Sequence, residues 1–199
     1  MARPTKTDDP RRTILAAARK LVVKHGHRQL SLRAVAAEAG FSPASLYEYF
    51  DGKAELVSAL AARAQALLLD RLRRAAGGRA PAAALVEVGL AYVAFAREHR
   101  EDFLLLFTGL ESRRSGLLQA VPIDSPYELL AVTVRAALAR QGRNHPSEVV
   151  DGAAYALWAA AHGMAMLQLT HLARFSADFP TADRKALLAL VKGLHLDGR

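Results

Sequence analysis

The chain has 199 residues, is 52% hydrophobic but only 7% aromatic, and carries a formal net charge of +8. A core built mostly of Ala, Leu and Val favours helix over sheet, and the basic charge suggests a polyanionic partner, either nucleic acid or an anionic membrane surface. The lack of cysteine excludes disulfides and thiolate metal sites and fits a cytoplasmic protein, while MARPTKTDDPRR lacks the apolar run of a secretory signal.

The first predicted element is an amphipathic helix from Pro10 to His25, which follows a basic arm. Gly26 ends the helix because glycine adopts the turn conformation at little cost. Residues 1–33 contain nine Lys and Arg against two Asp, so most of the excess positive charge lies at this end. The apolar positions at helical spacing are Ile14, Leu15, Ala18, Leu21 and Val22.

Two short helices joined by a tight turn are predicted over residues 31–50, SLRAVAAEAGFSPASLYEYF. Ser31 is a good N-cap, Gly40 ends the first helix, and Ser42 with Pro43 begins the second. The inward positions are Leu32, Val35, Ala36, Ala39, Leu46 and Phe50, and the outward ones are Ala44, Ser45, Tyr47, Glu48 and Tyr49. An outward face of small and aromatic residues after a glycine turn is typical of a helix-turn-helix that enters the DNA major groove.

This segment, with the helix before it and Lys53 and Leu56 after it, resembles the DNA-binding domain of the tetracycline-repressor (TetR) family of bacterial transcription regulators. The match runs from about Arg11 to Leu56. The resemblance implies double-stranded DNA as a partner. Because a two-fold dimer presents two equal heads, it also implies an operator that is an inverted repeat.

On this interpretation, the residues expected to contact DNA have different roles. Tyr47 and Tyr49 contact phosphate or base edges, Ala44 lies near a thymine methyl, and Ser45 lies near a base or phosphate oxygen. Glu48 either accepts from a cytosine amino group or pairs with an arginine such as Arg33. The whole expected contact surface is Ser31, Arg33, Ser42, Pro43, Ala44, Ser45, Tyr47, Tyr49 and Lys53, in which Ser31, Arg33 and Lys53 bind phosphate.

The rest of the chain is also predicted to be helical. A fourth helix from Gly52 through Leu72 is too long for the DNA-reading unit alone and should continue into the next domain, and residues 73–81, RRAAGGRAP, are expected to form a loop. We therefore expect an all-α protein with a helix-turn-helix domain over residues 1–68 and a larger dimerisation and ligand domain over residues 69–199. Its further helices are expected over residues 82–98, 101–110, 125–141, 146–174 and 181–196, separated by ESRRSG with Pro122, QGRNHP and FSADFP.

An uncharged stretch runs from Gly152 to Ala173, long enough to span a bilayer. It carries Tyr, His, Gln and Thr, which is polar for a lone membrane span, so we favour a helix buried on nearly all sides, usually at a subunit interface. In the family that it resembles, the last two helices usually form a four-helix bundle with those of a second subunit. The sequence therefore predicts a homodimer with no membrane partner.

Trp158, His162 and Gly163 resemble the Trp-x-x-x-His-Gly signature of one class of TetR-type C-terminal domain. Trp158 and His162 share a helix face. His162 is either a core histidine hydrogen-bonded to a carbonyl or a tyrosine, or a polar contact to a small molecule. The expected effector pocket comprises Phe103, Phe107, Tyr127, Trp158 and His162, although the same residues could serve a purely structural core.

No metal ligand, catalytic residue or cofactor is expected, because no carboxylate or second histidine lies at ligand spacing near His162 and no nucleophile or phosphate-loop motif occurs. The function predicted is a ligand-responsive transcriptional regulator, a repressor released by a small-molecule effector. The alternatives are a basic helical protein at a membrane surface and a helical enzyme with its site near His162.

Overall fold

The computed structural model describes residues 9–108, 124–140, 142 and 145–198, and every regular element within them is helical. The predicted all-α class is confirmed. The described residues form two compact units: a first unit of the residues up to Ala64 together with those from Glu101 to Thr108, and a second unit of Gln65–Arg100 and the residues from Asp124 onward. The predicted domain boundary after residue 68 remains a prediction.

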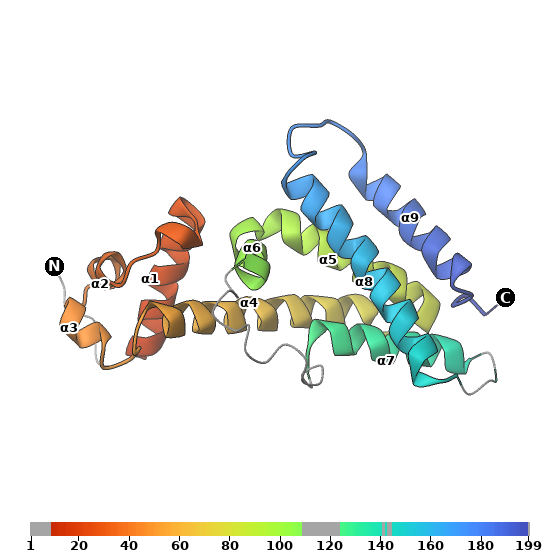
Figure 1. Ribbon diagram of the computed structural model, residues 1–199, viewed down its shortest axis with the longest axis horizontal. Coiled ribbons are helices and arrows are strands. Elements are labelled where there is room, and N and C mark those ends of the chain that lie inside the picture. Colours follow the sequence, from red (N-terminus) through yellow and green to blue (C-terminus); the bar gives the residue numbers. More distant parts are fainter. Residues whose placement is uncertain (1–8, 109–123, 141, 143–144, 199) are drawn as a thin grey trace. The chain divides into compact units, whose positions relative to one another are not determined.

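Local capping sets the helices at the start of the first unit, α1 (Pro10–His25), the short 3₁₀ helix η1 (His27–Gln29), α2 (Leu32–Ala39) and α3 (Pro43–Leu46) (Figure 1). The Ser31 hydroxyl accepts from the Ala34 N–H at 3.2 Å, as an N-cap should. Gly40 ends α2 with φ at 76°, a left-handed conformation that suits glycine. Ser42 caps α3 by accepting from the Ser45 N–H at 3.0 Å.

Helix α3 has only four residues, and the chain continues from it as tight turns. The N–H groups of Tyr47, Glu48 and Tyr49 each donate to the carbonyl three residues back, at 3.1–3.3 Å. Aromatic side chains lose rotamer freedom in a helix, which favours this early end. We call residues 43–49 the reading segment.

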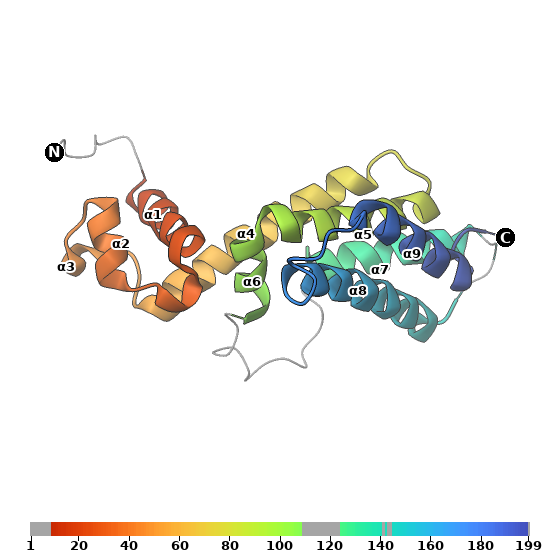
Figure 2. The same cartoon turned by 90° about the horizontal axis from the view of Figure 1, so that it is seen from above.

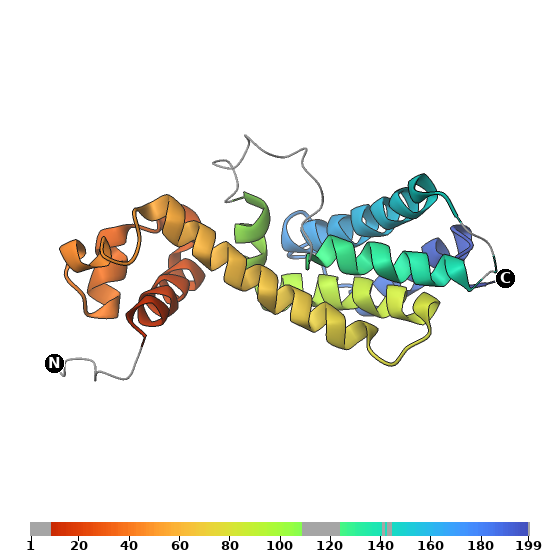
Figure 3. The same ribbon diagram turned by 90° about the horizontal axis from the view of Figure 1, so that it is seen from below.

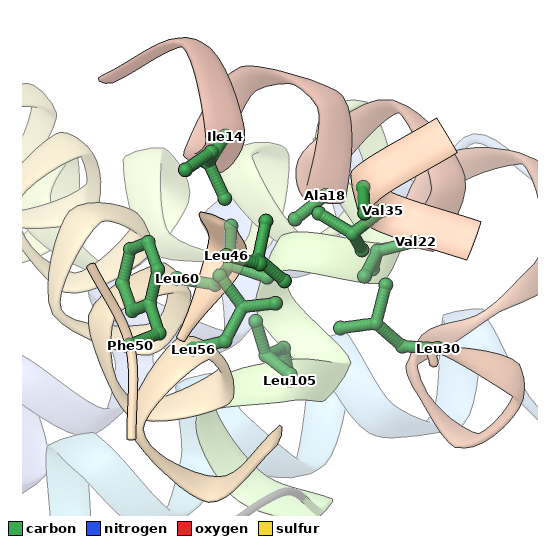
Figure 4. Close-up of a cluster of buried hydrophobic side chains, with 11 residues drawn as sticks. Ile14, Ala18, Val22, Leu30, Val35, Leu46, Phe50, Leu56, Leu60 and Leu105 are labelled. Atoms are coloured by element: carbon green, nitrogen blue, oxygen red, sulfur yellow. The ribbon is translucent and has the colours of Figure 1, made fainter. Parts of the chain in front are cut away.

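The first unit has a continuous apolar core, to which a helix from much later in the chain contributes a side chain (Figure 4). Leu105 of α6 (Arg100–Thr108) is almost fully buried among side chains of α1, α2, α3 and α4 (Lys53–Ala76). Burying a leucine contributes about 1.5–3 kcal/mol. The core consists of Ile14, Ala18, Val22, Leu30, Val35, Ala36, Leu46, Phe50, Leu56, Leu60 and Leu105.

The long helix α4 runs through Ala76, so the prediction that residues 73–76 form a loop is wrong. Arg and Ala are strong helix formers and give the helix no reason to stop after Leu72. The turn begins at Gly77, and Gly78 has φ at 70°. The helix starts in the first unit and ends in the second.

The second unit is built around α5 (Pro81–Glu98), which packs against α7 (Pro126–Ala139), α8 (Ser147–Leu169) and α9 (Phe179–Gly193). Figure 1 shows α8 and α9 side by side, Figure 2 shows these helices gathered together, and Figure 3 shows α7, in green, running alongside α5, in yellow-green. Gly89 of α5 allows α9 to come close, because a Cβ there would lie 2.8 Å from a methyl group of Leu187.

Further helix ends differ from the prediction, among them the end of α9, which lies at Gly193 rather than Leu196. Helix α8 stops at Leu169 rather than Arg174, because the Thr170 hydroxyl donates to the Met166 carbonyl at 2.6 Å and its backbone leaves the helical conformation. Helix α9 begins at Phe179 rather than Thr181, since Asp178 caps it and Pro180 is tolerated in its first turn. None of the described helices is both long and apolar enough to cross a bilayer.

Several predicted features lie outside the described residues. They are the arm at residues 1–8, the end of the sixth helix at 109–110, the ESRRSG segment with Pro122, and Gln141 with part of QGRNHP.

Candidate functional site

The reading segment exposes most of the side chains that were predicted to face DNA. Tyr47 is 58% exposed, and Ser42, Pro43, Ala44 and Glu48 are exposed beside it. The hydroxyl groups of Ser42 and Ser45 lie 2.8 Å apart, so the cap also orients the Ser45 side chain. The exposed face therefore lies on a short helix whose start is capped by Ser42.

Tyr49 differs from the prediction that it faces outward. It is half-buried, packs against the first unit's core, and meets the Phe41 ring edge-on with 6.1 Å between ring centroids. The two tyrosines of the reading segment are thus not equivalent. The tight turns after Leu46 rotate Tyr49 towards Phe41, which helical periodicity alone could not indicate.

The expected phosphate-binding groups lie on the elements that flank the reading segment. Ser31 and Arg33 are exposed at the start of α2. Lys53, the first residue of α4, donates its ammonium to the Arg28 carbonyl at 3.3 Å. Among the described residues no ion pair joins Glu48 to Arg33.

An aromatic cluster of the second unit, Tyr92, Tyr127, Trp158 and His162, brings together α5, α7 and α8. The hydroxyl of Tyr92 lies 2.9 Å from Nδ1 of His162. The Trp158 ring meets the Tyr127 ring edge-on at 5.2 Å and lies 6.4 Å from the His162 ring. The tyrosine hydrogen bond considered for His162 is therefore present, and Tyr92 is a member that the predicted pocket omitted.

Burial shifts the pKa values of two members of this aromatic cluster. Burial raises the pKa of Tyr92, and a hydrogen bond with Trp158 opposes that rise. An indole can only donate, so the Tyr92 oxygen accepts from Trp158. Burial also lowers the pKa of His162.

Phe103 and Phe107, predicted as the opposite wall of the pocket, belong to α6 and to the first unit. Their rings are in contact, tilted at 51° with centroids 4.9 Å apart, and Phe103 is fully buried. Tyr127, Trp158 and His162 belong to the second unit. The structure therefore brings three of the five predicted pocket residues together, and the place of the two phenylalanines in a pocket stays a prediction.

A separate cleft of about 420 Å³ lies between α5 and α9, where Arg184 donates to Glu87 at 2.7 Å. It contains none of the predicted site residues. No group of three or more His, Asp or Glu side chains in the described part of the chain could hold a metal ion.

Two sequence profiles match the chain. Residues 14–60, which include α2, α3 and the reading segment, match the profile described as "Bacterial regulatory proteins, tetR family". Residues 85–191, more than half of the chain, match "Tetracyclin repressor-like, C-terminal domain". The chain belongs to the TetR family.

Solved structures show the same TetR fold along nearly the whole chain. A protein of unknown function from Rhodococcus sp. RHA1 is 25% identical, covers 96% of this chain and 98% of its own, and superposes with a TM-score of 0.77. A TetR-like transcriptional regulator from the same organism is 22% identical, with 97% and 98% covered and a TM-score of 0.67. A TetR variant from Acinetobacter baumannii AYE in complex with minocycline is 21% identical, with 96% and 97% covered and a TM-score of 0.67.

No curated protein matches the chain in sequence. TetR-family proteins are DNA-binding transcription regulators that respond to small molecules, and dimers are typical of them. Membership favours the regulator over the membrane-surface protein and the helical enzyme. The resemblance to the Trp-His-Gly class is a finer point that these matches leave open.

Proposed function

We propose that the chain is a homodimeric repressor that binds an inverted-repeat operator and is released by a small-molecule effector in the cytoplasm, with no catalytic role. The observation that carries the proposal is the TetR match over residues 14–60, which coincides with an exposed Tyr47 on a capped helix-turn-helix. The two identical DNA-binding domains of a two-fold dimer would occupy half-sites spaced by about one helical turn of DNA.

The proposed DNA contacts divide by chemistry. Tyr47 and Ala44 read base edges, with Ala44 near a thymine methyl. Ser31, Arg33 and Lys53 bind phosphate, as does whichever of Ser42 and Ser45 does not donate its hydroxyl proton to the other. Pro43 fixes the backbone conformation at the start of α3. Tyr49 is half-buried, so at most its hydroxyl group contacts DNA.

The dimer is proposed to form through α8 and α9. The outer face of α8 carries small residues, and neither Gly152 nor Gly163 has any side chain or neighbouring backbone within 4 Å of where a Cβ would stand. Tyr155 is 65% exposed beside them, and Leu188 of α9 is 51% exposed. A second copy of α8 and α9 would cover these apolar groups, which water otherwise contacts.

The effector is proposed to bind at the aromatic cluster. Trp158 is 37% exposed, so one face of the cluster is accessible, and Tyr92 and His162 supply polar atoms inside an otherwise apolar body. An effector that binds the DNA-free state better by about 1–3 kcal/mol would release the operator.

A gel-shift titration with the chain's own promoter region tests the proposal. The expected result is a specific complex, resistant to competitor DNA, whose affinity falls steeply as salt rises. Binding to all DNA alike, or to anionic vesicles but not to DNA, would overturn it. Footprinting should reveal a symmetric inverted repeat, and a single asymmetric half-site would contradict the dimeric mode.

A further inference from the structure

We propose that Arg11, on the first turn of α1, is a positioning residue for DNA recognition, because it clamps the junction between the reading segment and α4. The inference rests on the proposed DNA-binding function. It concerns a side chain that is not itself in the predicted contact surface.

The Arg11 guanidinium touches three parts of that junction at once. Nη1 donates to the Tyr49 carbonyl at 2.5 Å, at the last residue of the reading segment. Nη2 donates to Oε1 of Glu55 at 2.8 Å, in the first turn of α4. Between these contacts, the guanidinium carbon lies 4.3 Å from the centroid of the Phe50 ring, a cation–π distance.

Glu55 extends the clamp to the backbone between α3 and α4. Its second oxygen, Oε2, accepts from the Asp51 N–H at 2.7 Å. The hydrogen bond from Arg11, followed by the one from Asp51, holds the pKa of Glu55 below its usual range. Tyr49, Asp51 and Glu55 are thus tied to one side chain of α1 through successive hydrogen bonds.

This clamp matters because α3 is too short to fix its own direction. With four residues it forms barely one turn, and an isolated turn is not stable by itself. The orientation of Tyr47 depends on what holds the chain on both sides of it. Ser42 holds the start of the segment, and Arg11 holds its end.

Lysine could not replace Arg11 in this role, although it would keep the charge. The clamp needs two donors in a fixed fork and a flat cation over a ring, which guanidinium has and ammonium lacks. A residue that only attracted phosphate would tolerate lysine. The two roles therefore separate in Arg11→Lys.

Glu55→Gln distinguishes the same two roles by changing the partner of Arg11. If Arg11 simply bound phosphate, removing the nearby carboxylate charge would leave DNA binding unchanged or tighter. If Arg11 positions the segment, losing its ionic partner weakens binding. Arg12→Lys is the matched control, since Arg12 is the exposed neighbour on α1.

The experiment measures operator and random-DNA affinity over a range of salt for the full chain and these variants. Arg11→Lys and Glu55→Gln should each weaken operator binding by about fivefold or more, with random-DNA affinity and the salt slope unchanged, while Arg12→Lys matches the parent. Operator binding within about twofold of the parent in both variants would overturn the inference. So would equal losses on operator and random DNA.

Amide hydrogen exchange provides a readout that needs no DNA. The Asp51 N–H should exchange faster in Arg11→Lys and Glu55→Gln than in Arg12→Lys, at unchanged melting temperature. Unchanged exchange in both variants would refute the clamp even if the parent binds its operator. A parent that binds no operator refutes the proposed function and takes this inference with it, whatever the exchange shows.

Discussion

Arg19 on α1 holds Asp102 on α6 with both carboxylate oxygens engaged: Nη2 lies 2.6 Å from Oδ2, and Nε lies 3.1 Å from Oδ1. Asp102 is only 6% exposed, and its hydrogen bonding raises the pKa of Arg19. Both residues belong to the first unit. A single residue separates α6 from α5, which belongs to the second unit. The ion pair therefore fixes α6 to the first unit directly after the chain leaves α5.

Arg19→Ala should destabilise the first unit by about 1–3 kcal/mol, because it takes the guanidinium away from a buried carboxylate. Lys20→Ala is the matched control. It removes an exposed pair with Glu38 on the same helix and should have little effect. Chemical denaturation compares the two, and equal losses would contradict the importance of the Arg19 pair.

Tyr47→Ala should abolish specific operator binding while the helical content stays unchanged, since Tyr47 is exposed and lies outside the core. Tyr49→Ala should instead lower the melting temperature, because its ring packs on Phe41. Gel shifts and circular dichroism separate the two outcomes. An operator affinity changed by less than about 1 kcal/mol in Tyr47→Ala would remove Tyr47 from the base-reading face.

Lys53→Ala should weaken binding to operator and random DNA alike and reduce the slope of log affinity against log salt by about one. The expected cause is the loss of one phosphate contact. The hydrogen bond from Lys53 to the Arg28 carbonyl is exposed, so its loss should disturb the fold little. A loss confined to the operator, with an unchanged salt slope, would argue for a base contact instead.

His162 should make the second unit less stable in mild acid. Its pKa lies below the ordinary 6.5 because of burial, so the unfolded chain binds a proton more readily than the folded one. Stability is therefore full above about pH 6.5 and falls as pH drops through that value. Melting curves of His162→Gln between pH 7.5 and 5.5 should show a smaller fall than those of the parent.

A fluorescent apolar probe tests the effector site, because Trp158 is the only tryptophan in the chain. Anilinonaphthalene sulfonate bound at the aromatic cluster should quench Trp158 emission. His162→Gln should weaken that quenching while operator binding and melting at pH 7.5 stay normal. A variant that unfolds early, or that quenches like the parent, would leave His162 as a core residue.

Gly163→Leu should weaken the proposed dimer, because it places a bulky side chain on the face where a second α8 would approach. For an isolated chain, removing the helix cost of glycine should be favourable by about 1 kcal/mol, because a Cβ at this position would have no neighbouring atom within 4 Å. Sedimentation at micromolar concentration measures whether the parent and the variant are dimers or monomers. A parent that sediments only as a 21.5 kDa species would contradict the dimer itself.

The local architecture of the reading segment could be predicted from the sequence alone. Ser31, Gly40 and Ser42 act within three or four residues of themselves, through cap hydrogen bonds and the left-handed conformation of glycine, and the structure has each as expected. The same local rules misplaced the ends of α4 and α8. Arg73–Ala76 has no breaker and stayed helical, and Thr170 ended α8 through a hydroxyl bond to its own helix.

Only the tertiary structure decided which distant residues meet. The sequence marked Leu105, Arg11, Tyr92 and His162 as apolar, basic or polar, but periodicity says only that a face is buried, not against which helix. Leu105 lies in the core of the DNA-reading unit, and Tyr92 meets His162 across 70 positions of chain. Which helices pack together depends on how well their whole side-chain surfaces fit one another, and that fit is decided only in the assembled fold.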